Sequence, residues 1–194
     1  MTNRAPNDRE PKTGRVGRPS DEALMERFCR GEGDAFDALF SRHAKALYLY
    51  LLRMVSNEAL AEDLLQATFL AFVRARRSYQ AGSRVAPWLY SIAANAARDS
   101  RRRLQRCLEE STPNGRAPTH GGFAEPPPID PGLSRLVKQA LEQLPPAQRE
   151  AVLLHRFHEL SFAEIAAAAG TSEGAAKVRA HRGYEKLRTL LKNF

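Results

Sequence analysis

Residues 160–191 read LSFAEIAAAAGTSEGAAKVRAHRGYEKLRTLL, and this stretch decides the fold of the second half of the chain. Ser161 and Glu164 form a capping box, in which a hydroxyl and a carboxylate three residues apart satisfy unpaired N–H groups at a helix start. The box predicts a short helix over residues 162–169. Gly170 ends it, because glycine turns the chain sharply without steric cost.

A second helix is predicted directly after this turn. Ser172 supplies an N-cap hydroxyl, and Glu173 places a carboxylate at the positive end of the helix dipole. An apolar stripe then recurs at helical spacing: Ala176, Ala180, Tyr184, Leu187 and Leu191. The opposite face is basic, and residues 174–194 hold six Lys or Arg against the single acid Glu185. The pattern is typical of a helix-turn-helix whose second helix enters a DNA major groove. The alternative is a solvated basic helix on an ordinary bundle.

Composition limits the function classes. The chain has 194 residues, a net charge of +8 and a pI of about 9.9, which favours a polyanionic partner. Cys29 and Cys107 lie far apart in no ligand spacing, as expected in a reducing cytosol. No apolar run approaches the ~20 residues that span a bilayer, and the polar N-terminus is no signal peptide. We therefore expect a cytoplasmic protein without membrane insertion.

The rest of the sequence predicts an all-α protein made of two small helical domains. Residues 1–20 hold three prolines and lack apolar periodicity, and they are expected to form a disordered arm. Apolar positions at 3.6-residue spacing make residues 21–106 a helical domain. Residues 107–132 hold six of the twelve prolines and four of the twelve glycines, which indicates a flexible linker. Residues 133–194 form the second domain, which ends in the helix-turn-helix.

Helix boundaries within these domains follow from local signals. We expect helices over residues 21–30 and 58–77, and a longer one that Asp34 caps and that runs through Leu52. Another helix should open at Trp88, just after Pro87. Its inner stripe is apolar or small: Leu89, Ile92, Ala93, Ala96 and Ser100. In the second domain, a helix should run to Leu144, and Pro145-Pro146 should end it and start the next.

The predicted helix over residues 58–77 carries an unusual face. Five residues fall within an arc of about 100° at 100° per residue: Asp63, Gln66, Leu70, Arg74 and Arg77. An apolar anchor with a polar rim is typical of a protein-docking face. A single exposed leucine is also common on surfaces and needs no function. The residues alone leave both interpretations open.

A second candidate surface follows residues 78–87, a loop that contains Tyr79. Polar residues recur along the helix that Trp88 opens: Ser91, Asn95, Arg98, Arg102 and Arg106. Aromatic rings stack on bases, while amides and guanidinium groups contact base edges and phosphates, so this surface suits single-stranded nucleic acid. Trp88 and Tyr79 can equally belong to the core, and the loop can still bind while Trp88 packs internally.

The sequence gives little support for a catalytic or a metal-binding function. His155 and His158 stand three residues apart on one helix face, but no cysteine cluster or paired carboxylate accompanies them. The sequence shows no phosphate-binding glycine loop and no nucleophile elbow. We therefore expect a protein that is not an enzyme and that uses no metal or other cofactor.

Three stretches together resemble the extracytoplasmic-function (ECF) sigma factors of bacterial RNA polymerase. Residues 61–75, AEDLLQATFLAFVRA, resemble the region-two helix that grips the polymerase clamp. Residues 86–103, APWLYSIAANAARDSRRR, resemble the segment that opens the −10 promoter element. Residues 141–191 resemble region four, which reads the −35 element. The three motifs in this order, separated by a linker, are highly specific, and they cover about 21–106 and 133–191.

The resemblance implies roles for individual residues. Asp63 and Gln66 match clamp-contacting positions, which favours the docking interpretation of the face around Leu70. The loop that contains Tyr79, together with Asn95, matches the part that captures a flipped −10 base. The resemblance implies −35 contacts along the last helix, where the candidate residues are Ser172, Lys177, Val178, Arg179, His181 and Arg182. The family's usual run Gly-Thr-Val-Lys-Ser-Arg is here Gly-Ala-Ala-Lys-Val-Arg over residues 174–179, so two hydroxyl groups are missing.

The function implied is a sigma factor that binds core RNA polymerase, the duplex −35 element and the single-stranded −10 element. An anti-sigma factor is the expected regulator. One alternative is a stand-alone helix-turn-helix transcriptional regulator, but residues 21–106 lack the βα alternation of a receiver domain. Another is a protein that masks polymerase without reading DNA, against which the basic recognition helix and the arginines within residues 98–106 argue.

Overall fold

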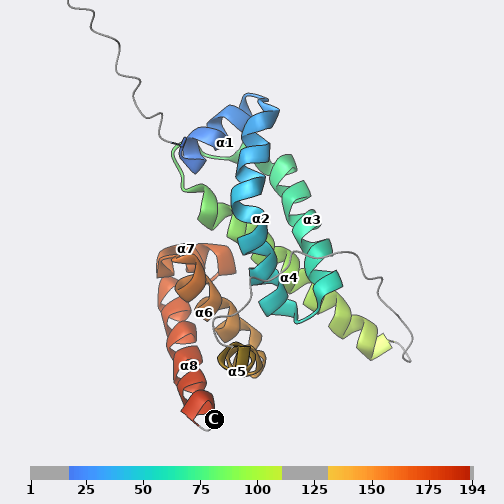
Figure 1. Ribbon diagram of the computed structural model, residues 1–194, viewed down its shortest axis with the longest axis vertical. Coiled ribbons are helices and arrows are strands. Elements are labelled where there is room, and N and C mark those ends of the chain that lie inside the picture. The colour runs from blue at the N-terminus through green and yellow to red at the C-terminus, as the bar shows by residue number, and fades with distance from the viewer. Residues whose placement is uncertain (1–17, 111–130, 193–194) are drawn as a thin grey trace, which may run out of the picture.

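The structure is a computed structural model, and it describes residues 18–110 and 131–192. These residues form helices and no strand (Figure 1). The elements in chain order are α1 (Asp21–Cys29), α2 (Gly33–Val55), α3 (Glu58–Ala75), the 3₁₀ turn η1 (Arg76–Ser78), α4 (Val85–Glu110), α5 (Pro131–Glu142), α6 (Pro146–His158), α7 (Phe162–Ala169) and α8 (Glu173–Lys192). The prediction of an all-α fold with two helical domains is confirmed. The predicted arm and most of the predicted linker lie outside the described residues.

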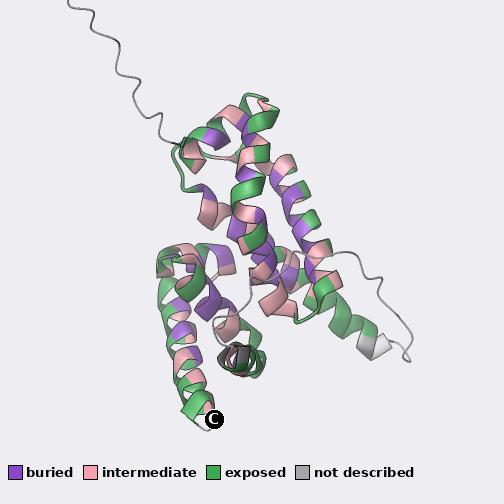
Figure 2. Ribbon diagram, viewed as in Figure 1, coloured by how far each residue is buried: buried purple, intermediate pink, exposed green. Residues whose placement is uncertain are grey.

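Helices α1–α4 form the N-terminal bundle. Ser20 caps α1 by accepting a hydrogen bond from the Ala23 N–H at 3.1 Å, and Asn57 caps α3 through the Leu60 N–H at 2.9 Å. The buried faces of these helices meet in one core, where the Phe28 and Phe72 rings stack with centroids 5.9 Å apart. The apolar faces of the four helices are therefore buried against one another, which holds the helices together as one bundle (Figure 2).

Several predicted boundaries were wrong. Helix α2 begins at Gly33 with Glu32 at the N-cap, so Asp34 lies inside the first turn, where it accepts a hydrogen bond from Arg27 at 2.6 Å. Helix α4 begins at Val85, ahead of Pro87, which the first turn accommodates because its N–H groups lack intrahelical partners anyway. The same helix continues through residues 107–110, which composition had assigned to the linker.

Helices α5–α8 form the C-terminal bundle, and its helix-turn-helix follows the prediction closely. Both reciprocal bonds of the Ser161 and Glu164 capping box are present, and Gly170 adopts φ 59° at the turn. Helix α8 packs along α6 through Gly183, where a Cβ would lie 2.6 Å from Val152 Cγ2. This close approach fixes the angle between α8 and α6.

The two bundles lie against each other. Helix α7 packs on α4, and α6 packs on the C-terminal part of α2 (Figure 1). This packing explains why the buried face of α4 is wider than its predicted stripe. Tyr90, Ala94 and Ala97 are buried as well as Leu89 and Ala93.

Candidate polymerase and nucleic-acid interfaces

The candidate protein-docking face lies on the outer side of α3. Asp63 and Gln66 are exposed, and Leu70 is 58% exposed. The opposite side of the helix is anchored in the core by its apolar residues, including Leu65 and Phe69. The structure therefore brings the three predicted residues onto one solvent-facing surface of a rigid helix.

Phe40 of α2 enlarges the apolar surface beside α3. Its side chain is 36% exposed and packs against Phe69 with ring centroids 4.7 Å apart. The helical periodicity of α2 does not distinguish a core position from one at the edge of the core, which is why sequence reasoning missed it.

The aromatic residues before and within α4 are held internally. Trp88 packs on Phe72 and Tyr79 with ring centroids 5.1 and 5.4 Å away, and the Tyr79 hydroxyl donates to the Ser83 carbonyl. Both rings are half-buried. Burial raises the pKa of the Tyr79 hydroxyl, so it remains a neutral donor at physiological pH. The two rings thus brace the loop, and each keeps one exposed part.

The polar face of α4 is divided between solvent and the C-terminal bundle. Asn95 is exposed, and its side-chain oxygen accepts a hydrogen bond from the Arg98 guanidinium. Arg102 is exposed and pairs with Asp99 at 3.0 Å, an i,i+3 pair that is worth little in water. Arg98 is only 19% exposed, because its guanidinium also bonds to Glu150 of α6 and to the Ala168 carbonyl of α7. Asn95 and Arg102 therefore face solvent, whereas Arg98 lies between the bundles.

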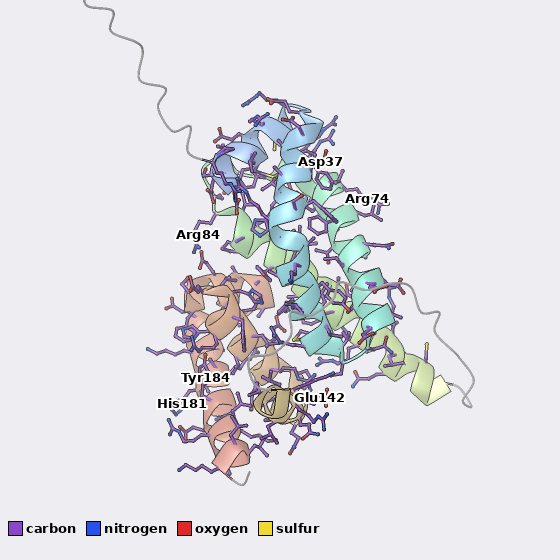
Figure 3. All side chains as sticks on the ribbon, viewed as in Figure 1. Asp37, Arg74, Arg84, Glu142, His181 and Tyr184 are labelled. Carbon is purple, nitrogen blue, oxygen red and sulfur yellow. The ribbon has the colours of Figure 1, made fainter. Side chains whose placement is uncertain are left out.

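The face of α8 that points away from α6 presents the predicted DNA contacts. Ser172 caps the helix by accepting from the Ala175 N–H at 3.2 Å. Exposed side chains follow at Lys177, Val178, His181 and Arg182, and His181 is labelled in Figure 3. Val178 is 49% exposed, which is unusual for a valine on a basic surface.

Arg179 differs from its neighbours on α8. Its side chain is half-buried. Burial raises the pKa of the Glu150 carboxyl group, and the nearby charges of Arg98 and Arg179 oppose that rise. Arg179 is among the residues predicted to contact the −35 element, but its half-buried position near Glu150 favours an internal electrostatic role. On the supporting side of the helix, Tyr184 and His155 share a hydrogen bond at 2.9 Å.

Aromatic rings form the centre of the interface between the bundles. His158 at the end of α6 packs on Tyr90 and Tyr50 with ring centroids 4.2 and 5.6 Å away. Among the described residues, neither the Tyr50 hydroxyl nor His158 Nε2 finds a hydrogen-bond partner. Burial lowers the pKa of His158 to about 4, with Arg53 adding to the effect, so the docked imidazole is neutral.

Polar contacts surround these rings. Arg149 of α6 donates to the Met54 carbonyl at the C-terminal end of α2 at 3.0 Å. Arg84 projects from the loop before α4 toward α7 and pairs with Glu164 at 2.6 Å (Figure 3). Sequence reasoning missed this interface, because its contacts join residues far apart in the chain, which helical spacing does not reveal.

No cluster of His, Cys, Asp and Glu suited to a metal ion occurs within residues 18–110 and 131–192. In the same parts of the chain, no helix is both long enough and apolar enough to cross a bilayer.

Comparison with known proteins identifies the two bundles. The family model Sigma-70 region 2 matches residues 39–107, and the model Sigma-70, region 4 matches residues 134–187. The chain is 53% identical over 167 residues to the RNA polymerase sigma factor CarQ of Myxococcus xanthus, covering 86% of this chain and 95% of that one. It is 34% identical over 180 residues to the ECF RNA polymerase sigma factor SigE of Mycolicibacterium smegmatis, covering 89% and 70%. The chain belongs to the ECF sigma factors.

Solved sigma-factor structures share the arrangement of helices. The sigma factor RpoE of Bartonella quintana, solved with the anti-sigma factor NepR, superposes with a TM-score of 0.69 at 27% identity. The match covers 81% of this chain and 96% of that one. CnrH, solved with the cytosolic domain of CnrY, gives a TM-score of 0.67 at 28% identity and covers 89% and 97%. Each superposition spans helices of both bundles.

Docking of the two sigma bundles is expected to weaken as the pH falls. The groups that face the His158 ring are Tyr50 and Arg53 of α2 and Tyr90 of α4. Its pKa is about 4 when docked against an ordinary value of 6.5, so the undocked chain takes up the proton first. Docking is therefore strongest above pH 6.5 and weakens progressively as the pH drops toward 4. Between about pH 7.5 and about pH 5.5 the docking equilibrium constant should fall about tenfold.

Single-molecule FRET can measure this change in the full chain. One dye is placed on exposed Cys107 and the other on Thr189→Cys of α8, with Cys29→Ser preventing a third label. The control His158→Phe keeps an aromatic ring between the tyrosines but cannot be protonated. A docked population that is equally pH-dependent in this control would refute the role of His158.

Proposed function

We propose that this chain directs core RNA polymerase to promoters by dividing recognition between its two bundles. The N-terminal bundle binds core polymerase through Asp63, Gln66 and Leu70 on α3. The C-terminal bundle binds the duplex −35 element through α8. The observation that carries this proposal is the pair of sigma-70 matches, region 2 followed by region 4, on a chain whose candidate contact residues mostly lie on exposed helix faces.

The −10 element is assigned to the surface around the start and middle of α4. Tyr79 and Trp88 offer exposed ring parts for stacking on unpaired bases, and Asn95 offers an amide for a base edge. Arg98 and Arg102 supply guanidinium groups for the phosphates of the same strand. An exposed amide beside arginines and rings is what a single strand requires, whereas a duplex would hide its base faces.

The −35 contacts are assigned to Ser172, Lys177, Val178, His181 and Arg182, with Arg179 in the supporting position described above. Val178 provides an apolar surface that suits a thymine methyl group, and Arg182 has the donors for a guanine edge or a phosphate. In this proposal the chain itself catalyses no reaction and uses no metal, since polymerisation belongs to the core enzyme. It acts where polymerase and chromosome are, in the cytoplasm.

Regulation by an anti-sigma factor is part of the proposal. It is supported by the two solved relatives named above, one of which is recorded with an anti-sigma factor and the other with the cytosolic domain of CnrY. The similarity covers both bundles, so a partner of that kind would find the corresponding helices here.

Replacing Arg182 with alanine tests the −35 assignment. If Arg182 reads a base edge, the change should cost about 1–3 kcal/mol in promoter binding and relax the preference at one base pair. Binding is measured by selection from a randomised −35 library and by titration of the selected duplexes. Arg188→Ala removes the same charge from an exposed position later on α8 and serves as the control. A uniform loss across all sequences would make Arg182 a phosphate contact instead.

A further inference from the structure

In the proposed function the Arg98 guanidinium has two alternative partners, the C-terminal bundle and the −10 strand. In the structure its guanidinium bonds to Glu150, to the Ala168 carbonyl at 2.7 Å and to the Asn95 side chain. The first two partners belong to the C-terminal bundle. A guanidinium has five N–H donors in a fixed fork, and these contacts engage the end of the fork that a phosphate would bind. The docked chain therefore has little capacity left at Arg98 for DNA.

The surface next to Arg98 is covered as well. Helix α7 packs on α4, and Ala94 and Ala97, which precede Asn95 and Arg98 in the chain, are buried. A strand of DNA that runs from exposed Asn95 to the Arg98 guanidinium would meet α7 at the Ala168 carbonyl. The same α4 face thus has two alternative occupants.

The contacts that hold α7 and α6 in place are suited to release. The side chain of Glu150 is only 6% exposed, so the carboxylate depends on Arg98 for compensation while it is buried. On undocking, water reaches both ions at once, so the gain from their pairing and the cost of their desolvation largely cancel. The unpartnered Tyr50 hydroxyl and His158 Nε2 also regain hydrogen bonds in water. The interface is specific without being strongly stabilising.

We propose that the C-terminal bundle and the single-stranded −10 DNA compete for one face of α4, with Arg98 as the group that both bind. This inference rests on the proposed function, because it assigns Asn95 and Arg98 to the −10 strand. Glu150 acts as the internal substitute for a DNA phosphate. The apparent affinity for single-stranded DNA is then the affinity of the undocked chain multiplied by the fraction of chains that are undocked.

Glu150→Gln tests the competition directly. The amide keeps the size of the side chain but leaves Arg98 without its anion in the docked state, so the docking equilibrium constant should fall about tenfold or more. The docked population is measured by the Cys107 and Thr189→Cys FRET pair. Affinity for a single-stranded DNA pool of random sequence is measured by fluorescence anisotropy and should rise in the same proportion. Circular dichroism confirms that the helices are retained.

Two further variants make the result specific. Glu185→Gln on α8 changes the net charge equally but touches only Arg188 of its own helix, so neither docking nor DNA affinity should change beyond a small electrostatic effect. Glu164→Gln removes the partner of Arg84 while glutamine still suits a capping box. Because Arg84 is 61% exposed, this variant should shift docking less than Glu150→Gln does.

Competition also predicts that adding the DNA pool to the unmodified chain lowers its docked population, because the coupling between two ligands of one surface is reciprocal. A Glu150→Gln chain that stays as docked as the unmodified chain overturns the proposal. So does an undocked Glu150→Gln chain with unchanged DNA affinity, provided that adding Asn95→Ala still weakens its binding. If Asn95→Ala has no effect in the undocked chain, the −10 assignment itself fails.

Discussion

Replacing Asp63 and Gln66 together with alanine is expected to abolish the association of this chain with core RNA polymerase. Both side chains are exposed, so the change removes no buried contact from the core. Residues at the centre of a protein interface can each contribute about 2 kcal/mol or more, so the double change should weaken binding roughly 1,000-fold. Co-purification with tagged core enzyme, followed by titration, measures the effect.

The same helix provides the controls for this experiment. Glu58→Ala removes an exposed carboxylate at the start of α3, outside the predicted set, and should leave polymerase binding unchanged. Leu70→Ala removes the apolar anchor that is 58% exposed and should give an intermediate loss. Undiminished co-purification of the double variant, with thermal stability unchanged, would show that polymerase binds elsewhere.

Asn95→Ala is expected to impair promoter opening while leaving duplex −35 binding intact. The exposed amide is lost without a cavity, and alanine favours the helix, so the fold should survive. Losing a hydrogen bond to an unpaired base should cost about 1–3 kcal/mol in the open complex. Permanganate footprinting of unpaired thymines reports opening, and binding to a −35 duplex reports the other bundle.

Gln105→Ala is the matched control, since it removes an exposed amide from the same helix α4. It should leave both readouts unchanged. If Asn95→Ala reduces −35 binding and promoter opening to the same extent, the amide affects the chain as a whole, and the −10 assignment would have to be withdrawn.

Local signals made much of this structure predictable. The Ser161 and Glu164 box and the glycine at position 170 each act within a few residues, so their outcome depends little on the rest of the chain. Helix periodicity likewise placed Asp63, Gln66 and Leu70 on one outer face of α3, because a 100° step per residue fixes which side chains share a side.

The packing of the two bundles against each other could not be predicted from the sequence. Tyr90 is buried although it lies outside the predicted stripe of α4, and His158 from the other bundle packs against both Tyr90 and buried Tyr50. The sequence pattern made Arg98 one of a series of solvent-facing arginines, and its contacts with Glu150 and the Ala168 carbonyl distinguish it from Arg102. Nothing in the spacing of either bundle encodes a partner that lies far away in the chain.

Composition led to the wrong prediction for the end of α4. Proline and glycine content marks where helices are unfavourable over a window of residues, but not where the last helical turn lies. Residues 107–110 contain neither, and they continue the helix. Gly183 was missed for the opposite reason, because a glycine inside a helix reveals a close approach only once the neighbouring helix with Val152 is in place.

Run-off transcription with purified core polymerase is the most direct test of the account. Genomic promoter fragments are transcribed by core enzyme with and without this chain, and the transcripts are mapped. The account predicts discrete start sites that appear only when the chain is present and that disappear with the Asp63→Ala and Gln66→Ala double variant. Transcripts identical to those of core enzyme alone would contradict it.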